Sequence, residues 1–247
     1  MTTSSKANRP PGLTLPFLLG ALVCAVGFAW VPQMIVQAPV ESTMGPVQKI
    51  FYFHVPCAWL LMLSVFVCAG GSVAYLFKGS EAGDRLARAS AELAVLFGIC
   101  VLVTGPLWGR VAWGVYWQWD ARLTSSLLLW LIMLAYLLAR RYGGPASRKL
   151  AAALALFAAA DVPLVYVSVH IWRTIHPKTS VVPSLQPEMR SVFWTSLLLF
   201  SVFWGVLLAV RLRLERLRAE VETLHLDVED ALEDPAGLPP LMETKRA

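Results

Sequence analysis

Six apolar stretches separated by short polar segments dominate the hydropathy pattern of this 247-residue chain. A helix needs about 20 predominantly apolar residues to cross the hydrocarbon core of a bilayer. Each stretch reaches or approaches that length, so we predict an all-α polytopic membrane protein with six transmembrane helices. The expected spans are residues 13–36, 56–77, 89–107, 123–139, 150–170 and 191–210.

The composition agrees with a membrane protein and excludes other classes. Charged residues make up 15% of the chain and apolar residues 57%, whereas soluble domains carry about 25% charged residues. A disordered chain is excluded too, because disorder requires low hydrophobicity and high charge. The four cysteines lie in apolar stretches without C-x-x-C spacing, so neither a disulfide framework nor a thiolate metal site is indicated.

The distribution of Lys and Arg predicts the orientation in the membrane. Six spans place both termini on one side. If that side is the cytoplasm, the inner segments up to residue 218 carry 13 Lys and Arg and the outer loops carry 6. Positive residues are retained on the cytoplasmic side, so we expect both termini in the cytoplasm. The net charge of +5 then follows from topology, and nucleic acid is not expected as a partner.

Three regions are expected along the chain. Residues 1–12 are predicted to be a disordered cytoplasmic N-terminus. Residues 13–210 form the membrane domain, and its first span is too long for a signal peptide, which favours an uncleaved anchor. Residues 211–247 form a charged helical tail that is either a solvated amphipathic helix, which we favour, or a docking helix for a cytoplasmic partner. Its apolar residues recur at helical spacing: Leu217, Val221, Leu224, Val228 and Ala231.

Common catalytic motifs are missing from the sequence. There is no G-x-x-x-x-G-K-[ST] loop for nucleotide hydrolysis, and no G-x-G-x-x-G, H-E-x-x-H or G-x-S-x-G. No C-x-x-C-H occurs either, so haem is not expected to be attached covalently in the c-type manner. We therefore do not expect this chain to hydrolyse nucleotide by the route that such a loop provides.

Tryptophan is concentrated on the predicted outer side, where nine of the ten tryptophans lie. Aromatic belts at membrane interfaces explain some of them. They do not explain the crowded outer connection at about residues 108–122, which would place Trp113 and Trp117 on one face if it were helical. We favour a platform for a large flat apolar ligand over a short interfacial helix. The platform residues are Trp108, Trp113, Trp117 and Trp119, together with Asp120.

Three of the four histidines also lie on the outer side: His54, His170 and His176. A single histidine at the margin of a span is usually an interfacial polar residue. Two histidines from different loops beside a tryptophan-rich surface are more readily explained as ligands of a bound group. Imidazole is a common axial ligand of haem iron. Arginines would suit the two haem carboxylates, because guanidinium pairs with them bidentately, although ordinary loop contacts are the alternative. The candidates are Arg110, Arg122 and Arg173.

Residues 113–120, W-G-V-Y-W-Q-W-D, fit the W-G-x-x-W-x-W-D signature of haem-handling membrane proteins. The following A-R-L-T-S resembles the cytochrome c maturation protein C (CcmC) branch, and the Pro-Lys-Glu segment of haem lyase relatives is absent. Residues 53–59 resemble that branch's H-V-P-x-A-W segment, and residues 168–176 are similar to its second histidine segment. The resemblance covers the six-span core and not the two tails.

The resemblance implies haem delivery for c-type cytochrome assembly. It implies a protein of the bacterial inner membrane in which His54 and His176 ligate b-type haem non-covalently at the periplasmic face, on a platform that includes Gly114. The implied partners are the periplasmic haem chaperone CcmE, the ABC-type subunits CcmA and CcmB, and the small membrane protein CcmD, all at the lipid bilayer. Ile175 precedes His176 where the family has leucine, and the nearby His170 is an alternative ligand.

Two other functions are open. A b-type electron-transfer subunit would bury haem between spans with both ligands inside helices, whereas His54 and His176 are expected at span margins. A haem lyase would form thioether bonds, but the residues after Asp120 and the short outer loops argue against one. We expect a haem-presenting carrier and not an enzyme. The carrier releases haem when a partner's residue replaces an axial ligand.

Overall fold

The computed structural model describes residues 14–42, 44–144, 146–177 and 181–233, so the expectations for residues 1–12 and for the end of the tail lie outside it. These residues form seven α-helices and one short 3-10 helix, which confirms the all-α fold. The elements are α1 (Leu15–Gln37), η1 (Pro46–Ile50), α2 (Phe51–Lys78), α3 (Glu81–Trp113), α4 (Ala121–Tyr142), α5 (Ser147–Ile171), α6 (Val181–Ser184) and α7 (Pro187–Glu233).

Six of the helices are long and apolar enough to cross a membrane, namely α1, α2, α3, α4, α5 and α7. They coincide with the six predicted spans, but several extend beyond their apolar part. The start of α3 shows why: Ser80 caps the helix by accepting a hydrogen bond from Gly83 N, and Glu81 and Asp84 occupy its first turn. Both features stabilise a helix N-terminus, and a hydropathy window does not detect them.

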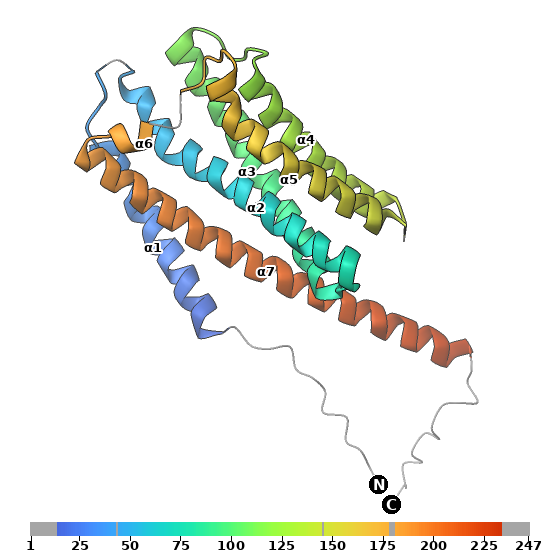
Figure 1. Cartoon of the computed structure of the whole chain (residues 1–247). Helices are drawn as coiled ribbons and strands as arrows, with labels where there is room; N and C mark the ends of the chain where they lie inside the picture. The colour runs from blue at the N-terminus through green and yellow to red at the C-terminus, as the bar shows by residue number, and fades with distance from the viewer. Residues whose placement is uncertain (1–13, 43, 145, 178–180, 234–247) are drawn as a thin grey trace, which may run out of the picture.

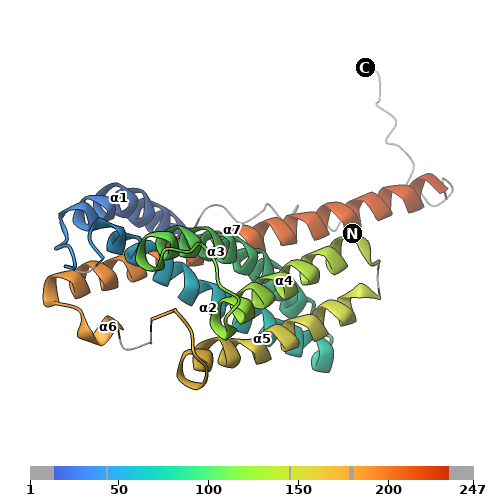
Figure 2. The ribbon, with the colours of Figure 1, turned by 90° about the horizontal axis from the view of Figure 1, so that it is seen from above.

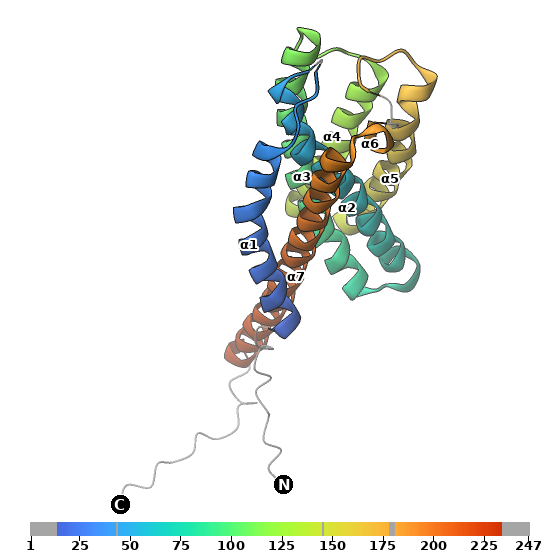
Figure 3. The ribbon, with the colours of Figure 1, turned by 90° about the vertical axis from the view of Figure 1, so that its left-hand side faces the viewer.

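Helices α2, α3, α4 and α5 enclose the main apolar core, and α7 packs across α2 and α3 (Figures 1 and 2). The α2–α3 contact is close because glycines face each other across it. A Cβ atom added to Gly71 would lie 2.5 Å from the Gly83 carbonyl oxygen. Helix α1 packs chiefly on α7, and Figure 3 shows these two helices side by side.

Buried charges join three helices near the α2–α3 turn. The Arg140 guanidinium of α4 donates to both carboxylate oxygens of Asp84 on α3, at 3.0 and 2.8 Å. Arg148 of α5 donates to the same carboxylate at 2.9 Å. Because Asp84 and Arg140 are largely buried, the pairing fixes how these helices meet.

The connections that carry the predicted site residues lie at the other end of the bundle. The α3–α4 connection and the segment after α5 meet at the top of Figure 1, whereas α1 begins and α7 ends at the bottom. The chain therefore brings the tryptophan motif and the second histidine segment together, although more than 50 residues separate Asp120 from Thr174 in sequence.

Candidate functional site

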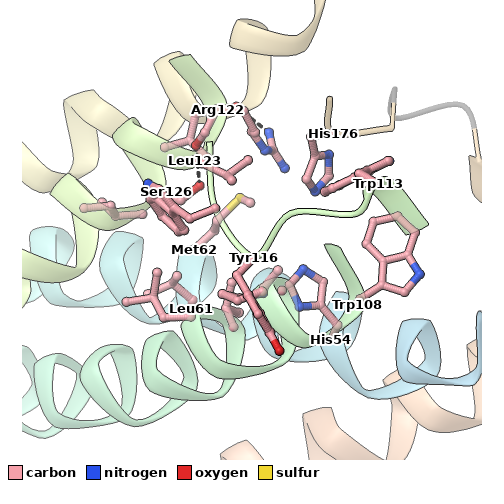
Figure 4. Close-up of a pocket in the computed structure, with 18 residues that line it drawn as sticks. His54, Leu61, Met62, Trp108, Trp113, Tyr116, Arg122, Leu123, Ser126 and His176 are labelled. Atoms are coloured by element: carbon pink, nitrogen blue, oxygen red, sulfur yellow. Dashed lines mark hydrogen bonds between the residues drawn. The ribbon is translucent and has the colours of Figure 1, made fainter. Parts of the chain in front are cut away.

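A pocket opens where the α3–α4 connection meets the segment after α5 (Figure 4). About 740 Å³ of space lies between its walls and in its open mouth. Most of its wall is apolar. The polar and aromatic side chains that line it include His54, Trp108, Trp113, Trp117, Arg122 and His176.

His54 points into the pocket from the first turn of α2 (Figure 4). Its Nδ1 lies 2.8 Å from Thr104 Oγ1 on α3. The Thr104 hydroxyl donates its own proton to the Cys100 carbonyl oxygen at 2.6 Å, so its oxygen can only accept from the imidazole. Nδ1 of His54 therefore carries the ring proton, and Nε2 keeps its lone pair.

His176 lies on the other side of the pocket, in the segment after α5 (Figure 4). Its Nδ1 lies 2.9 Å from the Pro177 carbonyl oxygen, which can only accept, so Nε2 again keeps the lone pair. Burial, together with the nearby Arg122 cation, lowers the pKa of His176 from 6.5 to about 4. The ring is neutral at pH 7 and has the form that binds a metal.

Asp120 joins the tryptophan motif to the segment that holds His176. One carboxylate oxygen accepts a hydrogen bond from Leu123 N at 2.8 Å and caps α4. The other accepts from the Thr174 hydroxyl at 2.5 Å and from Ile175 N at 3.1 Å. Thr174 Oγ1 in turn accepts from the backbone N–H of His176 at 3.1 Å. Asp120 does not line the pocket, but it positions a residue that does.

The four tryptophans of the predicted platform form two edge-to-face pairs. The ring centroids of Trp108 and Trp113 are 4.7 Å apart, and those of Trp117 and Trp119 are 5.7 Å apart. Three of the rings line the pocket, whereas Trp119 does not and is 75% exposed. Helix α3 reaches Trp113 and ends there, because Gly114 adopts a left-handed φ of +78°. The connection after Gly114 is not helical. Trp113 and Trp117 therefore do not share a helix face, although both line the pocket.

Of the three candidate arginines, Arg122 alone lines the pocket. Its guanidinium donates a hydrogen bond to the Val165 carbonyl oxygen of α5. Arg110 lies outside the pocket, with its guanidinium carbon 5.7 Å from the centroid of the Tyr116 ring. Arg173 also lies outside and is exposed.

The two candidates for a second histidine ligand occupy different places. His170 is exposed in the last turn of α5, with its ring 6.4 Å from that of Tyr166, and is not among the residues that line the pocket. His176 shares the pocket with His54. Sequence reasoning did not identify Thr104, because a threonine in an apolar helix carries no motif. Its role emerges only when α3 packs against α2.

The comparisons with known proteins agree with the motif. Residues 4–230 match the family described as Heme exporter protein C, CcmC. The chain is 35% identical over 209 residues to Heme exporter protein C of Bradyrhizobium diazoefficiens. The aligned region covers 84% of this chain and 78% of that protein. The chain belongs to the CcmC family. The family match continues to residue 230, well into the tail that the motif resemblance leaves out.

Other members of the CcmC family are similar over most of their length. Heme exporter protein C of Escherichia coli K12 is 32% identical over 217 residues, which covers 84% of this chain and 83% of that protein. A putative cytochrome c biosynthesis ccmC-like mitochondrial protein of Marchantia polymorpha is 32% identical over 162 residues, covering 63% of this chain and 69% of that protein.

Proposed function

We propose that this chain is a haem carrier of c-type cytochrome biogenesis that binds b-type haem non-covalently. The observation that carries the proposal is the arrangement of His54 and His176, which enter one pocket with Nδ1 hydrogen-bonded and Nε2 unprotonated. Ligand histidines typically use their second nitrogen in this way. The names of the CcmC relatives, Heme exporter protein C, support haem as the cargo.

The rest of the pocket suits a flat apolar macrocycle with acidic substituents. In the proposed complex, Trp108, Trp113 and Trp117 contact the ring, and Arg122 pairs with a propionate. The buried Nε1–H of Trp117 has no hydrogen-bond partner among the described residues, and a bound ligand would provide an acceptor.

The predicted site residues outside the pocket have other proposed roles. Asp120 and Gly114 shape the connection that carries the tryptophans. Trp119, Arg110 and Arg173 lie beyond the lining residues, where the part of the cargo outside the pocket or a recipient protein can meet them.

Release is proposed to occur by ligand exchange. His54 is built into α2, whereas His176 lies outside any helix and depends on Thr174 and Asp120 for its position. His176 is therefore the ligand that a recipient's residue replaces. The proposed recipient is the chaperone CcmE, in an assembly with CcmA, CcmB and CcmD. No bond of the cargo is made or broken except at the iron, so the role is transport and not catalysis.

The proposed location is the bacterial inner membrane, with both termini in the cytoplasm and the pocket on the periplasmic side. The imbalance of 13 to 6 in Lys and Arg supports this orientation. The pocket lies at the end of the bundle opposite to the start of α1 and the end of α7, which agrees with a periplasmic site (Figure 1).

Visible absorption spectra of the detergent-purified protein test the proposal. The wild type should yield a b-type pyridine haemochrome that acid extraction removes. His54→Ala and His176→Ala should lose the haem or shift its spectrum, and added imidazole should partly restore it by filling the vacated axial position. His170→Ala is the matched control and should keep a near-normal spectrum. Loss of haem in His170→Ala with retention in His176→Ala would show that the second ligand is misassigned.

A further inference from the structure

Helix α7 is far longer than a membrane span requires. It runs for 47 residues from Pro187 to Glu233, whereas about 20 residues cross the hydrocarbon core. Its last part, the α7 extension of residues 211–233, continues beyond the α2–α3 turn, away from the pocket (Figure 1). The length of this projection calls for an explanation other than spanning the membrane.

The base of the α7 extension is held against α3 by charges. Arg211 pairs with Glu92, and Arg88 lies 3.2 Å from Glu215, which is 5% exposed. These contacts fix both the direction of the extension and the face that it turns toward α3. The faces of the helix farther along are therefore presented in a defined orientation.

An apolar seam runs along a different face of the extension. Its five residues are separated alternately by three and four positions, which is the spacing of a and d positions in a coiled coil: Leu214, Leu217, Val221, Leu224 and Val228. With about 100° of rotation per residue, this seam lies well away from the face of Arg211 and Glu215. Val221, Leu224 and Val228 are 66%, 63% and 55% exposed. The seam has the geometry of one half of a helix–helix contact.

Arg213 and Arg218 lie beside the base of the seam at Leu214 and Leu217, whereas the charges beside its outer part, at Val221, Leu224 and Val228, are acidic. Residues 219–233 contain no Lys or Arg. The six acidic residues in this part are Glu220, Glu222, Asp227, Glu229, Asp230 and Glu233. A second copy of the chain in parallel register would bring the two acidic outer parts together, and like charges oppose pairing. The cytoplasmic leaflet is negatively charged as well, so a membrane surface would repel this face.

We propose that the outer part of the apolar seam of the α7 extension, at Val221, Leu224 and Val228, binds a partner protein through a basic amphipathic helix, with leucine-like residues facing the seam and Lys or Arg beside them. The apolar residues provide the contact area, and the opposite flanking charges select the partner. The proposed orientation of the chain places this partner in the cytoplasm. The binding itself depends only on the seam and its charges.

Two synthetic helical peptides provide a defined test with the full-length protein in phosphatidylcholine nanodiscs. Both carry Leu at a and d positions; one has Lys and the other Glu at e and g positions. Fluorescence anisotropy should show binding of the Lys peptide that weakens with salt, and little binding of the Glu peptide or to empty nanodiscs. The triple variant Val221→Gln, Leu224→Gln and Val228→Gln, which keeps good helix formers, should lose at least about tenfold in affinity.

Two further variants separate the seam from the rest of the helix. Leu226→Gln removes an equally exposed leucine outside the seam, 55% exposed in the structure, and should bind as the wild type does. Glu220→Lys with Asp227→Lys should weaken binding of the Lys peptide and favour the Glu peptide. Equal binding of both peptides, no binding, or unchanged binding in the triple variant would overturn the proposal.

The remaining outcomes would show that something other than a basic helix binds the seam, or that the proposed haem function is wrong. A wild-type dimer that the triple variant converts to a monomer, seen by light scattering, would assign the seam to a second copy. Binding of the wild type to anionic vesicles that the triple variant loses would assign it to lipid. Either result overturns the proposal. The haem spectrum should be the same in the wild type and in all seam variants. If the wild type itself binds no haem, the proposed function is refuted, but the peptide-binding result still stands.

Discussion

The Thr174 hydroxyl donates a hydrogen bond to the Asp120 carboxylate across 2.5 Å, which joins two segments that are distant in sequence. The same carboxylate caps α4, and the same threonine oxygen accepts from the backbone of His176. The aspartate that ends the tryptophan motif therefore determines where the second histidine lies. This relationship gives a physical reason for an acid at a position that does not reach the pocket.

Removal of Asp120 should disturb both the helix and the histidine. We expect Asp120→Ala to reduce haem occupancy and to lower stability by about 0.5–2 kcal/mol through loss of the N-cap. Thr174→Val breaks the link to His176 but leaves the cap intact, so it should reduce haem occupancy with a smaller change in melting temperature. Haem absorbance per protein and thermal unfolding in detergent measure the two effects. Full haem occupancy in Thr174→Val would show that the link does not position His176.

Thr104, the hydrogen-bond partner of His54, should affect haem affinity although it is not itself a ligand. Thr104→Val removes the acceptor for Nδ1 and frees the ring to rotate or change tautomer. Loss of such a partner typically weakens metal affinity by about 10–100-fold. Thr104→Ser keeps the hydroxyl and is the matched control. Titration of the apo-protein with haem should separate the two variants, and equal affinities would mean that His54 needs no such support.

The two tryptophans of one pair should behave differently. Trp117 lines the pocket, whereas Trp119 is largely exposed. Trp117→Ala should therefore lose most of the bound haem while the apo-protein stays in the membrane, and Trp119→Ala should keep haem when purified alone. Immunoblots of membranes report the amount of protein, and the Soret absorbance reports haem. Failure of both variants to accumulate would instead indicate that these rings are structural.

The fold was predictable from sequence because lipid imposes one dominant constraint. A segment that crosses the membrane must be apolar over its whole length, so all six spans are visible as stretches of hydropathy. The ends of the helices were less predictable. The start of α3 depends on Ser80 and Asp84, and the long α7 continues as a charged helix that hydropathy does not follow.

The candidate site was only partly predictable. The tryptophan motif and three histidines indicate a haem-like ligand, but spacing alone does not decide between His170 and His176, because both lie near the end of α5. Their separation depends on the turn after α5, where the chain leaves the helix at Ile171 and Thr174 bonds to Asp120. Thr104 depends in the same way on packing between α2 and α3. Tertiary contacts of this kind leave no local pattern in the sequence.

The orientation of the chain decides on which side of the membrane the proposed cargo is presented. Reporters that are active only in the periplasm should be active when fused after Asp120 and silent when fused after Gly143, since these positions follow α3 and α4. The expectation follows from Lys and Arg, which resist translocation and are concentrated near the start of α1, at the α2–α3 and α4–α5 turns and in residues 211–218 of α7. A cytoplasm-active reporter at the same sites is the control for expression and should give the inverse pattern. If the reporter after Gly143 is the active one, His54, His176 and the tryptophan motif face the cytoplasm. Delivery to a periplasmic chaperone would then be impossible from this pocket.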